Sequence, residues 1–238
     1  MRSLLSGTWN QTDMLRMLVR LIIIMLILPL HEFAHAWTAH KLGDDTASYR
    51  GRMTLNPIAH IDPIGALLLL FTGFGWAKPV PIDPTRFNRK HSVRFGVAIT
   101  ALAGPVSNLL AALIGMIILR IYSLSGVYHR YLEELSAGES VRSTPWFIYL
   151  CLSFFITINI GLALFNLIPI PPLDGSKVVG YFTSAKVDAW FIQNQQIVRI
   201  VFLIILFTGL LSTPLSWLSS KLYEFLWMIT DWIPKVFG

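Results

Sequence analysis

The sequence predicts an all-α protein with several membrane-spanning helices. Of its 238 residues, 54% are hydrophobic and only 13% are charged, whereas about 25% of the residues in an ordinary soluble domain are charged. The mean hydropathy is +0.60. Four apolar segments are long enough to cross a bilayer core of about 30 Å and two more are shorter. We therefore expect a polytopic membrane protein with about six membrane segments.

The first spanning helix is expected over residues 14–41, with an apolar first half and ionisable residues in its second half. Residues 43–65 are rich in Gly, Asn, Asp and Pro, a composition typical of turns and loops. The apolar stretch 66–76 is too short to span the membrane and is flanked by helix-breaking residues. We expect it to form a small re-entrant or strand-like element between the first two spanning helices, covered by protein or lining a cavity.

A polar loop over 77–94 leads to a second spanning helix at 95–124, which we expect to be interrupted at Gly104-Pro105. The third spans 145–165 and stops at "NLIPIPPLDG", where the prolines prevent continuation. A weaker helix at 176–186 and apolar runs at 197–213 and 215–234 follow. The whole chain is interpreted as one membrane-embedded domain, 1–238, with a core at about 14–186 and C-terminal helices at about 194–234.

Charge and cysteine content exclude other classes of protein. The formal net charge of +6 comes from basic residues in short loops between apolar runs, which is the pattern of the positive-inside rule and not of a nucleic-acid-binding face. The single cysteine, Cys151, lies within an apolar run, so there is no intrachain disulfide and cysteine does not bind metal here.

The motif "HEFAH" near the end of the first helix carries the strongest chemical signal. His31 and His35 are four residues apart and therefore share one face of a helix. Two imidazole nitrogens at this spacing can bind one zinc ion, and Glu32 between them is placed to act as a general base. The same pattern can arise by chance in an amphipathic helix, but ionisable residues inside a membrane are usually functional.

Catalytic zinc generally needs a third protein ligand. The candidates are His40, His60, His91, His129 and the acidic residues. Asp174 stands out among the acids because it follows the apolar helix in a turn with three prolines and Gly175. A turn with few conformations suits a ligand that must be placed accurately.

Charge distribution suggests the orientation in the membrane. Eight of the nineteen Lys and Arg residues lie between positions 41 and 94, so this region is expected on the cytoplasmic side. Both "HEFAH" and "LDG" then lie near that side, at similar depth. The N-terminal Arg2, Arg16 and Arg20 argue against this orientation.

The chain resembles the site-2 protease family of intramembrane zinc metalloproteases. The matching pieces are "HEFAH", "GPVSN" (104–108) and "NLIPIPPLDG" (166–175), while "GRMTLNPIAHIDPIG" and "FGWAKPVPI" are similar to segments of its small bacterial-type members. The resemblance covers about residues 25 to 180. It implies an extended, strand-like element at "GFGWAKPVP", where an edge could pair with an extended substrate, and no PDZ or CBS domain.

This resemblance implies one zinc ion per chain, bound by His31, His35 and Asp174, with Glu32 as general base. It further implies that Asn166 helps to stabilise the oxyanion or to orient the substrate, and that Asn108 contributes to substrate binding. The expected activity is hydrolysis of peptide bonds within or near transmembrane segments. The expected partners are a single-span membrane-protein substrate and the lipid bilayer.

Two other functions compete with the protease. A divalent-metal or proton transporter would also place His, Asp and Asn in membrane helices, but the sequence has no internal repeat and a conduit does not need the glutamate. A non-catalytic membrane scaffold is the second alternative, and the presence of all three expected ligands and Glu32 weakens it. The role of His60 stays open between an interfacial residue and one that supports the site.

Overall fold

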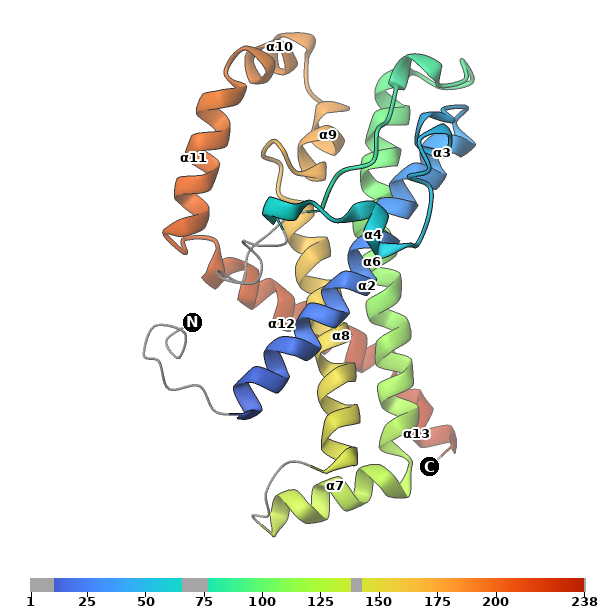
Figure 1. Ribbon diagram of the computed structural model, residues 1–238, viewed down its shortest axis with the longest axis vertical. Coiled ribbons are helices and arrows are strands. Elements are labelled where there is room, and N and C mark those ends of the chain that lie inside the picture. Colours follow the sequence, from blue (N-terminus) through green and yellow to red (C-terminus); the bar gives the residue numbers. More distant parts are fainter. Residues whose placement is uncertain (1–10, 66–76, 138–142, 238) are drawn as a thin grey trace.

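The structure, a computed structural model, describes residues 11–65, 77–137 and 143–237, which form helices joined by turns (Figure 1). These ranges contain no β-strand, and Ile61 and Ala77 form an isolated antiparallel bridge. The predicted all-α class is therefore confirmed. In chain order the elements are α2 (Gln11–Lys41), α3 (Thr46–Tyr49), α4 (Pro57–His60), the 3-10 helix η1 (Pro84–Arg86), α6 (Val93–Ser123), α7 (Gly126–Ser136), α8 (Thr144–Asn166), α9 (Asp174–Gly180), α10 (Ala185–Gln193), α11 (Gln195–Phe207), α12 (Ser212–Ile229) and α13 (Trp232–Phe237).

Three described helices, α2, α6 and α8, are long and apolar enough to cross a membrane. The helices α10 and α11 meet at a bend of 77° and make a fourth crossing if the bent pair is one span. The expectation of six membrane segments is not confirmed. The expected re-entrant element at 66–76 lies outside the described residues.

Capping side chains begin the two long helices of the core. The Ser92 hydroxyl accepts a hydrogen bond from the Phe95 amide at the start of α6, and Ser143 does the same for Trp146 at the start of α8. Helix α8 ends at Asn166, three residues before the first proline of the turn, as predicted.

The predicted interruption of the second spanning helix is wrong, because α6 runs unbroken through Gly104 and Pro105. Proline removes one main-chain hydrogen bond, but contacts with neighbouring membrane helices compensate for that loss. Here α6 packs against α2, α8 and α9. Its continuity keeps the residues on either side of Pro105 on one helix, where they can serve the same site.

Several helices were not expected from the sequence: the short α3, α4 and η1 lie in segments predicted as loops, and α7 and α10 are longer. Helix α7 carries mostly polar and aromatic residues, and α10 begins where the weaker helix predicted at 176–186 was expected to end. The structure divides that predicted helix into α9 and the start of α10. Hydrophobic periodicity over so few residues does not distinguish a short helix from a loop.

The helix α6 runs beside α2 and α8 (Figure 1) and packs against α2, α8, α9 and α12. One apolar cluster joins it to α8 and α12, and its buried members are Ala112, Met116, Leu119, Ile156, Ile160 and Leu226. A second cluster packs α2 against α8 through Val19, Ile23 and Ile27. These contacts set α2, α6 and α8 side by side and fix the second half of α2, which carries the two histidines.

Arg120 attaches the C-terminal helices to this core at the end of α6 remote from the histidines. Its guanidinium donates to the Trp227 carbonyl at 2.6 Å, lies 3.4 Å from the centre of the Trp227 indole ring and forms an ion pair with Asp231 at 3.2 Å. The Arg120 side chain is only 6% exposed. Arg120 lies sixteen positions after Gly104 on the same helix, which is about 24 Å at 1.5 Å per residue.

We predict that Arg120→Met lowers the thermal unfolding temperature and leaves zinc binding unchanged. The charge-assisted hydrogen bond to the Trp227 carbonyl alone is worth about 1.5–3 kcal/mol, and the contact is remote from the histidines. Circular dichroism melting of detergent-purified protein measures the first effect and metal analysis the second. Lys221→Met, which breaks an exposed ion pair with Glu224 on α12, is the matched control and should change neither; an equal loss of stability in both variants would refute the role of Arg120.

Candidate metal centre

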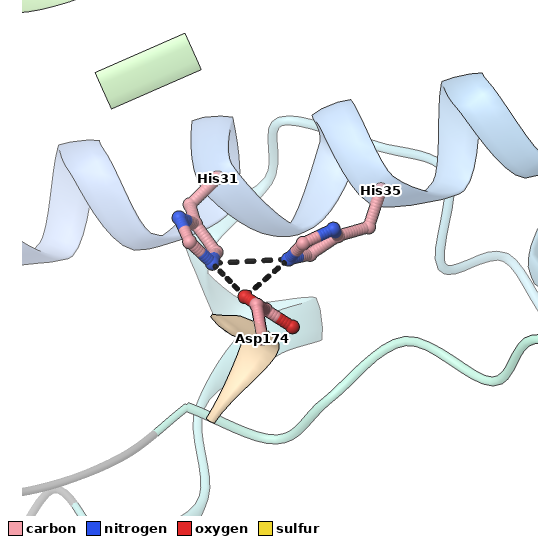
Figure 2. A group of neighbouring side chains, drawn as sticks. All are labelled: His31, His35 and Asp174. Atoms are coloured by element: carbon pink, nitrogen blue, oxygen red, sulfur yellow. Dashed lines mark hydrogen bonds and ion pairs between the residues drawn. The ribbon is translucent and has the colours of Figure 1, made fainter. Parts of the chain in front are cut away.

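Three side chains from two distant parts of the chain converge in the buried region between α2 and α9 (Figure 2). His31 and His35 come from α2, and Asp174 is the first residue of α9. The two Nε2 atoms are 3.0 Å apart, and Oδ2 of Asp174 lies 3.3 Å from His31 Nε2 and 3.1 Å from His35 Nε2. All three residues are at most 6% exposed.

This donor set fits a zinc ion. Zn–N and Zn–O bonds of about 2.0–2.1 Å at a tetrahedral ion place neighbouring ligand atoms about 3.3–3.4 Å apart. The three observed separations, 3.0, 3.1 and 3.3 Å, are close to that value. Two imidazoles and one carboxylate also leave a fourth position open, as catalytic zinc requires.

The ring nitrogens that face away from the cluster are also bonded. His35 Nδ1 lies 2.7 Å from the Thr100 carbonyl oxygen, and His31 Nδ1 lies 2.6 Å from Oδ1 of Asn108. A carbonyl only accepts, so Nδ1 of His35 is the donor and its Nε2 offers a lone pair to the cluster. Such outward hydrogen bonds are typical of metal-binding histidines.

The Asp174 carboxylate is held at both oxygens. Oδ2 faces the histidines, and Oδ1 accepts from Lys177 Nζ at 3.2 Å, one turn along α9. Burial alone would raise the pKa of this carboxyl, but without a metal ion the His31 and His35 rings donate to it when their Nε2 atoms are protonated, and the positive charges of His35 and Lys177 act in the same sense, so the pKa is held well below its usual range. Asp174 is therefore ionised at neutral pH, as a metal ligand must be. A cation bound between the three groups would take the place of those Nε2 protons.

Two glycines allow the segments to approach closely. A Cβ on Gly175 would lie 2.2 Å from the Leu167 carbonyl oxygen, so the turn that carries Asp174 packs directly on the end of α8. A Cβ on Gly104 would lie 2.4 Å from His35 Nε2 and 2.6 Å from His31 Nε2. Gly104 of α6 therefore forms one wall of the cluster.

Glu32 lies beside the cluster and is half-buried. Its Oε2 accepts a hydrogen bond of 2.9 Å from the amide of Val80, which packs in a buried group with Ala36 and Ala47. Two contacts fix the chain that carries Val80: the Lys78 amide donates to the His60 carbonyl at 2.8 Å, and Arg52 donates to the Lys78 and Pro79 carbonyls. The orientation of the glutamate is thus set by the loop packed over α2.

Among the described residues, no hydrogen bond or ion pair joins His60 to His31, His35 or Asp174. It is 2% exposed, and its Nε2 lies 2.8 Å from the Thr54 carbonyl oxygen. Of the other candidate ligands, His40 pairs with Asp45. Within the described parts of the chain, His31, His35 and Asp174 are the group of His, Cys, Asp or Glu side chains that could hold a metal ion.

The two asparagines predicted from the family resemblance lie in different places. Asn166 ends α8, is half-buried, and donates its amide to the Leu162 carbonyl of its own helix at 3.0 Å. Asn108 is fully buried behind His31, with its Nδ2 donating to Oδ1 of Asn159 at 2.9 Å. Catalysis by Asn166 and substrate binding by Asn108 stay predictions.

Sequence reasoning missed Thr100, Gly104 and Asn159 as parts of this centre. Asn159 carried a signal, because it is an amide in the apolar run "FFITINIGLALF" and polar groups in membrane helices are costly. Thr100 contributes a main-chain carbonyl, which no side-chain pattern reveals. Gly104 was assigned to a helix interruption, and only the packing of α6 on α2 shows its proximity to the histidines.

Over most of its length the chain is similar to a peptidase family and to proteins named "Putative zinc metalloprotease". The family model described as "Peptidase family M50" matches residues 19–209. "Putative zinc metalloprotease YwhC" of Bacillus subtilis is 41% identical over 189 residues, which cover 79% of this chain and 80% of that protein. "Putative zinc metalloprotease Rip2" of Mycolicibacterium smegmatis is 26% identical over 179 residues, 70% of this chain and 61% of that protein. No solved structure gives a significant match.

We predict that Gly104→Ala weakens zinc binding at least about 10-fold, the lower end of what is seen when groups around a metal site are changed. The added methyl group would occupy space within 2.6 Å of both Nε2 atoms. Zinc affinity is measured by competition with a chelator on the purified protein.

The matched control for this prediction is Gly161→Ala on α8, where an added Cβ meets nothing within 4 Å. This variant should bind zinc as the wild type does, since alanine also favours a helix interior. Unchanged zinc affinity in a folded Gly104→Ala protein would show that the histidines have room that the packing does not indicate.

Proposed function

This chain belongs to peptidase family M50, and we propose that it is a zinc-dependent endopeptidase that hydrolyses peptide bonds within or near the transmembrane segments of other membrane proteins. It is a multi-pass membrane protein of a metalloprotease family. The observation that carries the proposal is the convergence of His31, His35 and Asp174 beside Glu32.

In this proposal the four residues have separate roles. His31, His35 and Asp174 hold the zinc ion. When bound, zinc supplies a Lewis acid that polarises the scissile carbonyl and makes water a nucleophile at neutral pH. Glu32 takes a proton from the attacking water at a carboxylate oxygen and gives it to the nitrogen of the departing amine.

The hydrogen bond between Glu32 and Val80 supports this role. Oε2 accepts from the Val80 amide at 2.9 Å, and no hydrogen bond within the described parts of the chain holds Oε1. A carboxylate fixed through one oxygen keeps the other in a defined direction, which is what proton transfer over hydrogen-bond distance requires. The half-buried position of Glu32 also places it between the buried histidines and the loop region.

The substrate in this proposal is an extended peptide, since a peptide bond within a helix is shielded by neighbouring turns. Residues 78–80 contact Glu32 through the Val80 amide, and four of their main-chain groups are used within the protein: two amides by Glu32 and the His60 carbonyl, and two carbonyls by Arg52. Pairing of a substrate strand through any of these four groups requires exchange of the contact that the group now makes.

We further propose that the site opens towards the cytoplasmic side. The basic residues of 41–94 support this, as does the position of α3 and α9 towards the same end of the molecule (Figure 1). The proposed partner is a single-span membrane protein, whose segment would reach the site from the bilayer.

We predict that Glu32→Gln abolishes cleavage and leaves zinc bound. Glutamine keeps the size and a hydrogen-bonding end but cannot accept the proton, so turnover should fall by at least about 10²–10⁴. The assay uses purified protein in liposomes with a single-span test substrate, read on a gel, and metal analysis should find about one zinc per chain in both forms.

Glu224→Gln, an exposed change on α12, is the control and should cleave as the wild type does. Near-normal cleavage by Glu32→Gln would refute the mechanism. Zinc transport into the liposomes without peptide products would favour a transporter, and loss of zinc from Glu32→Gln would assign the glutamate to the metal instead of to the proton.

We predict that Asn166→Ala lowers turnover by about 10²–10³ and retains zinc, because an amide directed at a developing oxyanion supplies about 2.7–4 kcal/mol. Asn194→Ala is a matched control: Asn194 also ends a turn of helix by donating its amide to a carbonyl four residues earlier, that of Trp190. The control should cleave normally. A parallel fall of zinc and activity in Asn166→Ala would mean that Asn166 supports only the turn before Asp174.

A further inference from the structure

A chain of buried hydrogen bonds runs behind His31 through three helices. His31 Nδ1 of α2 lies 2.6 Å from Asn108 Oδ1 of α6. Asn108 Nδ2 donates to Asn159 Oδ1 of α8 at 2.9 Å, and Asn159 Nδ2 donates to the Phe155 carbonyl at 2.8 Å. Both asparagines are 0% exposed, so water does not replace either amide contact.

The last contact fixes the direction of every bond in this chain. The Phe155 carbonyl can only accept, so Asn159 must present its NH₂ group to it and its oxygen to Asn108. That oxygen requires the NH₂ group of Asn108, which leaves the Asn108 oxygen facing His31. Nδ1 of His31 is then the protonated nitrogen, and Nε2 carries a lone pair.

The Nε2 atom of His31 is the one that faces His35 and Asp174. If Asn108 turned its amide round, its NH₂ group would face Nδ1 and the ring proton would move to Nε2. A protonated nitrogen cannot bind a metal ion. Zinc binding by His31 therefore depends on the direction in which the Asn108 amide is held.

His35 shows why a second asparagine is needed for His31. Nδ1 of His35 bonds directly to the Thr100 carbonyl, a main-chain group with no alternative orientation. His31 bonds to a side-chain amide, which is nearly symmetric in shape and can turn. A main-chain carbonyl thus determines which ring nitrogen is protonated in both histidines. For His35 it acts directly, and for His31 it acts through the amides of Asn159 and Asn108.

We propose that Asn159 is a positioning residue of the zinc centre: by holding the Asn108 amide in one direction, it keeps the lone pair of His31 Nε2 facing the metal. This inference rests on the zinc site of the proposed function and adds a residue from α8 that touches neither metal nor substrate. Which nitrogen of His31 on α2 carries the proton thus depends on Asn159 of α8, which reaches His31 only through Asn108.

The first test is the zinc affinity of Asn159→Leu, measured by competition with a chelator. Leucine has the branched shape of asparagine, with somewhat larger methyl groups in place of the amide oxygen and nitrogen, and it has no hydrogen-bonding atoms, so the Asn108 amide is released. Zinc should bind about 10–100-fold more weakly, as is usual when the hydrogen bonds around metal ligands are removed. Ile160→Ala, at the next residue of α8 and 1% exposed, loosens the packing without touching the amides, and its zinc affinity should stay at the wild-type value.

A second substitution distinguishes the effect of the Asn108 amide direction from the effect of altered packing around residue 159. In Asn108→Asp the carboxylate has two acceptor oxygens and no donor, so it cannot turn the wrong group towards His31. Asn159→Leu should therefore weaken zinc binding much less in the Asn108→Asp background than in the wild type. An equal loss in both backgrounds, or wild-type zinc affinity in Asn159→Leu, would overturn the proposal.

A measurement on the unmutated protein does not depend on whether these variants fold. In zinc-free protein labelled with ¹⁵N-histidine, the nitrogen chemical shifts report which ring nitrogens carry protons. The His31 signals, assigned by their loss in His31→Gln, should show a proton on Nδ1, the nitrogen that faces the Asn108 oxygen; an Nδ1 without a proton would overturn the proposal. Absence of zinc binding by the wild-type protein would instead refute the proposed function, and the nitrogen shifts would still decide the role of Asn159.

Discussion

The convergence of three electron-pair donors in a buried space is the constraint on which the rest of this structure depends. Two imidazole nitrogens and a carboxylate oxygen lie within 3.3 Å of one another, between helices whose surroundings are apolar. Groups of this kind repel one another unless a cation or protons lie between them. The close approach of α6 at Gly104, the tight turn at Gly175 and the outward bonds of both rings all serve to keep these donors together.

The helices and the ligand cluster could be predicted from the sequence because the signals are local. The i, i+4 histidines define one face of α2, and the prolines after Asn166 define the end of α8. That Asp174 meets them was expected from the similar depth of the two motifs and from the family resemblance, and the structure places the three side chains together. Helices α7 and α10 and the course of α6 through Pro105 could not be predicted, because packing decides them. The same holds for Asn159 and Thr100, whose roles depend on which helix faces His31 and His35.

The loop region shows how a polar layer is fixed onto membrane helices. Asp44, 1% exposed, accepts from the amides of Thr46 and Asp83 and thereby ties the turn after α2 to the segment before η1. The Asn88 amide donates to the Leu42 carbonyl at 2.6 Å and adds a second tie between the same two segments. Val80 lies within the segment that these contacts hold, and its amide donates to Glu32. Contacts outside the membrane helices therefore help to set the direction of the Glu32 carboxylate.

The separation of 143 residues between His31 and Asp174 has a consequence for how the protein is made. At a synthesis rate of about 5–20 residues per second, the ribosome completes Asp174 about 7–30 s after His31. During that interval the nascent first helix carries two histidines and no carboxylate partner, so the complete ion-binding geometry does not yet exist. Acquisition of the ion is therefore a late event in biogenesis, and a chain stalled before residue 174 would enter quality control as an apoprotein.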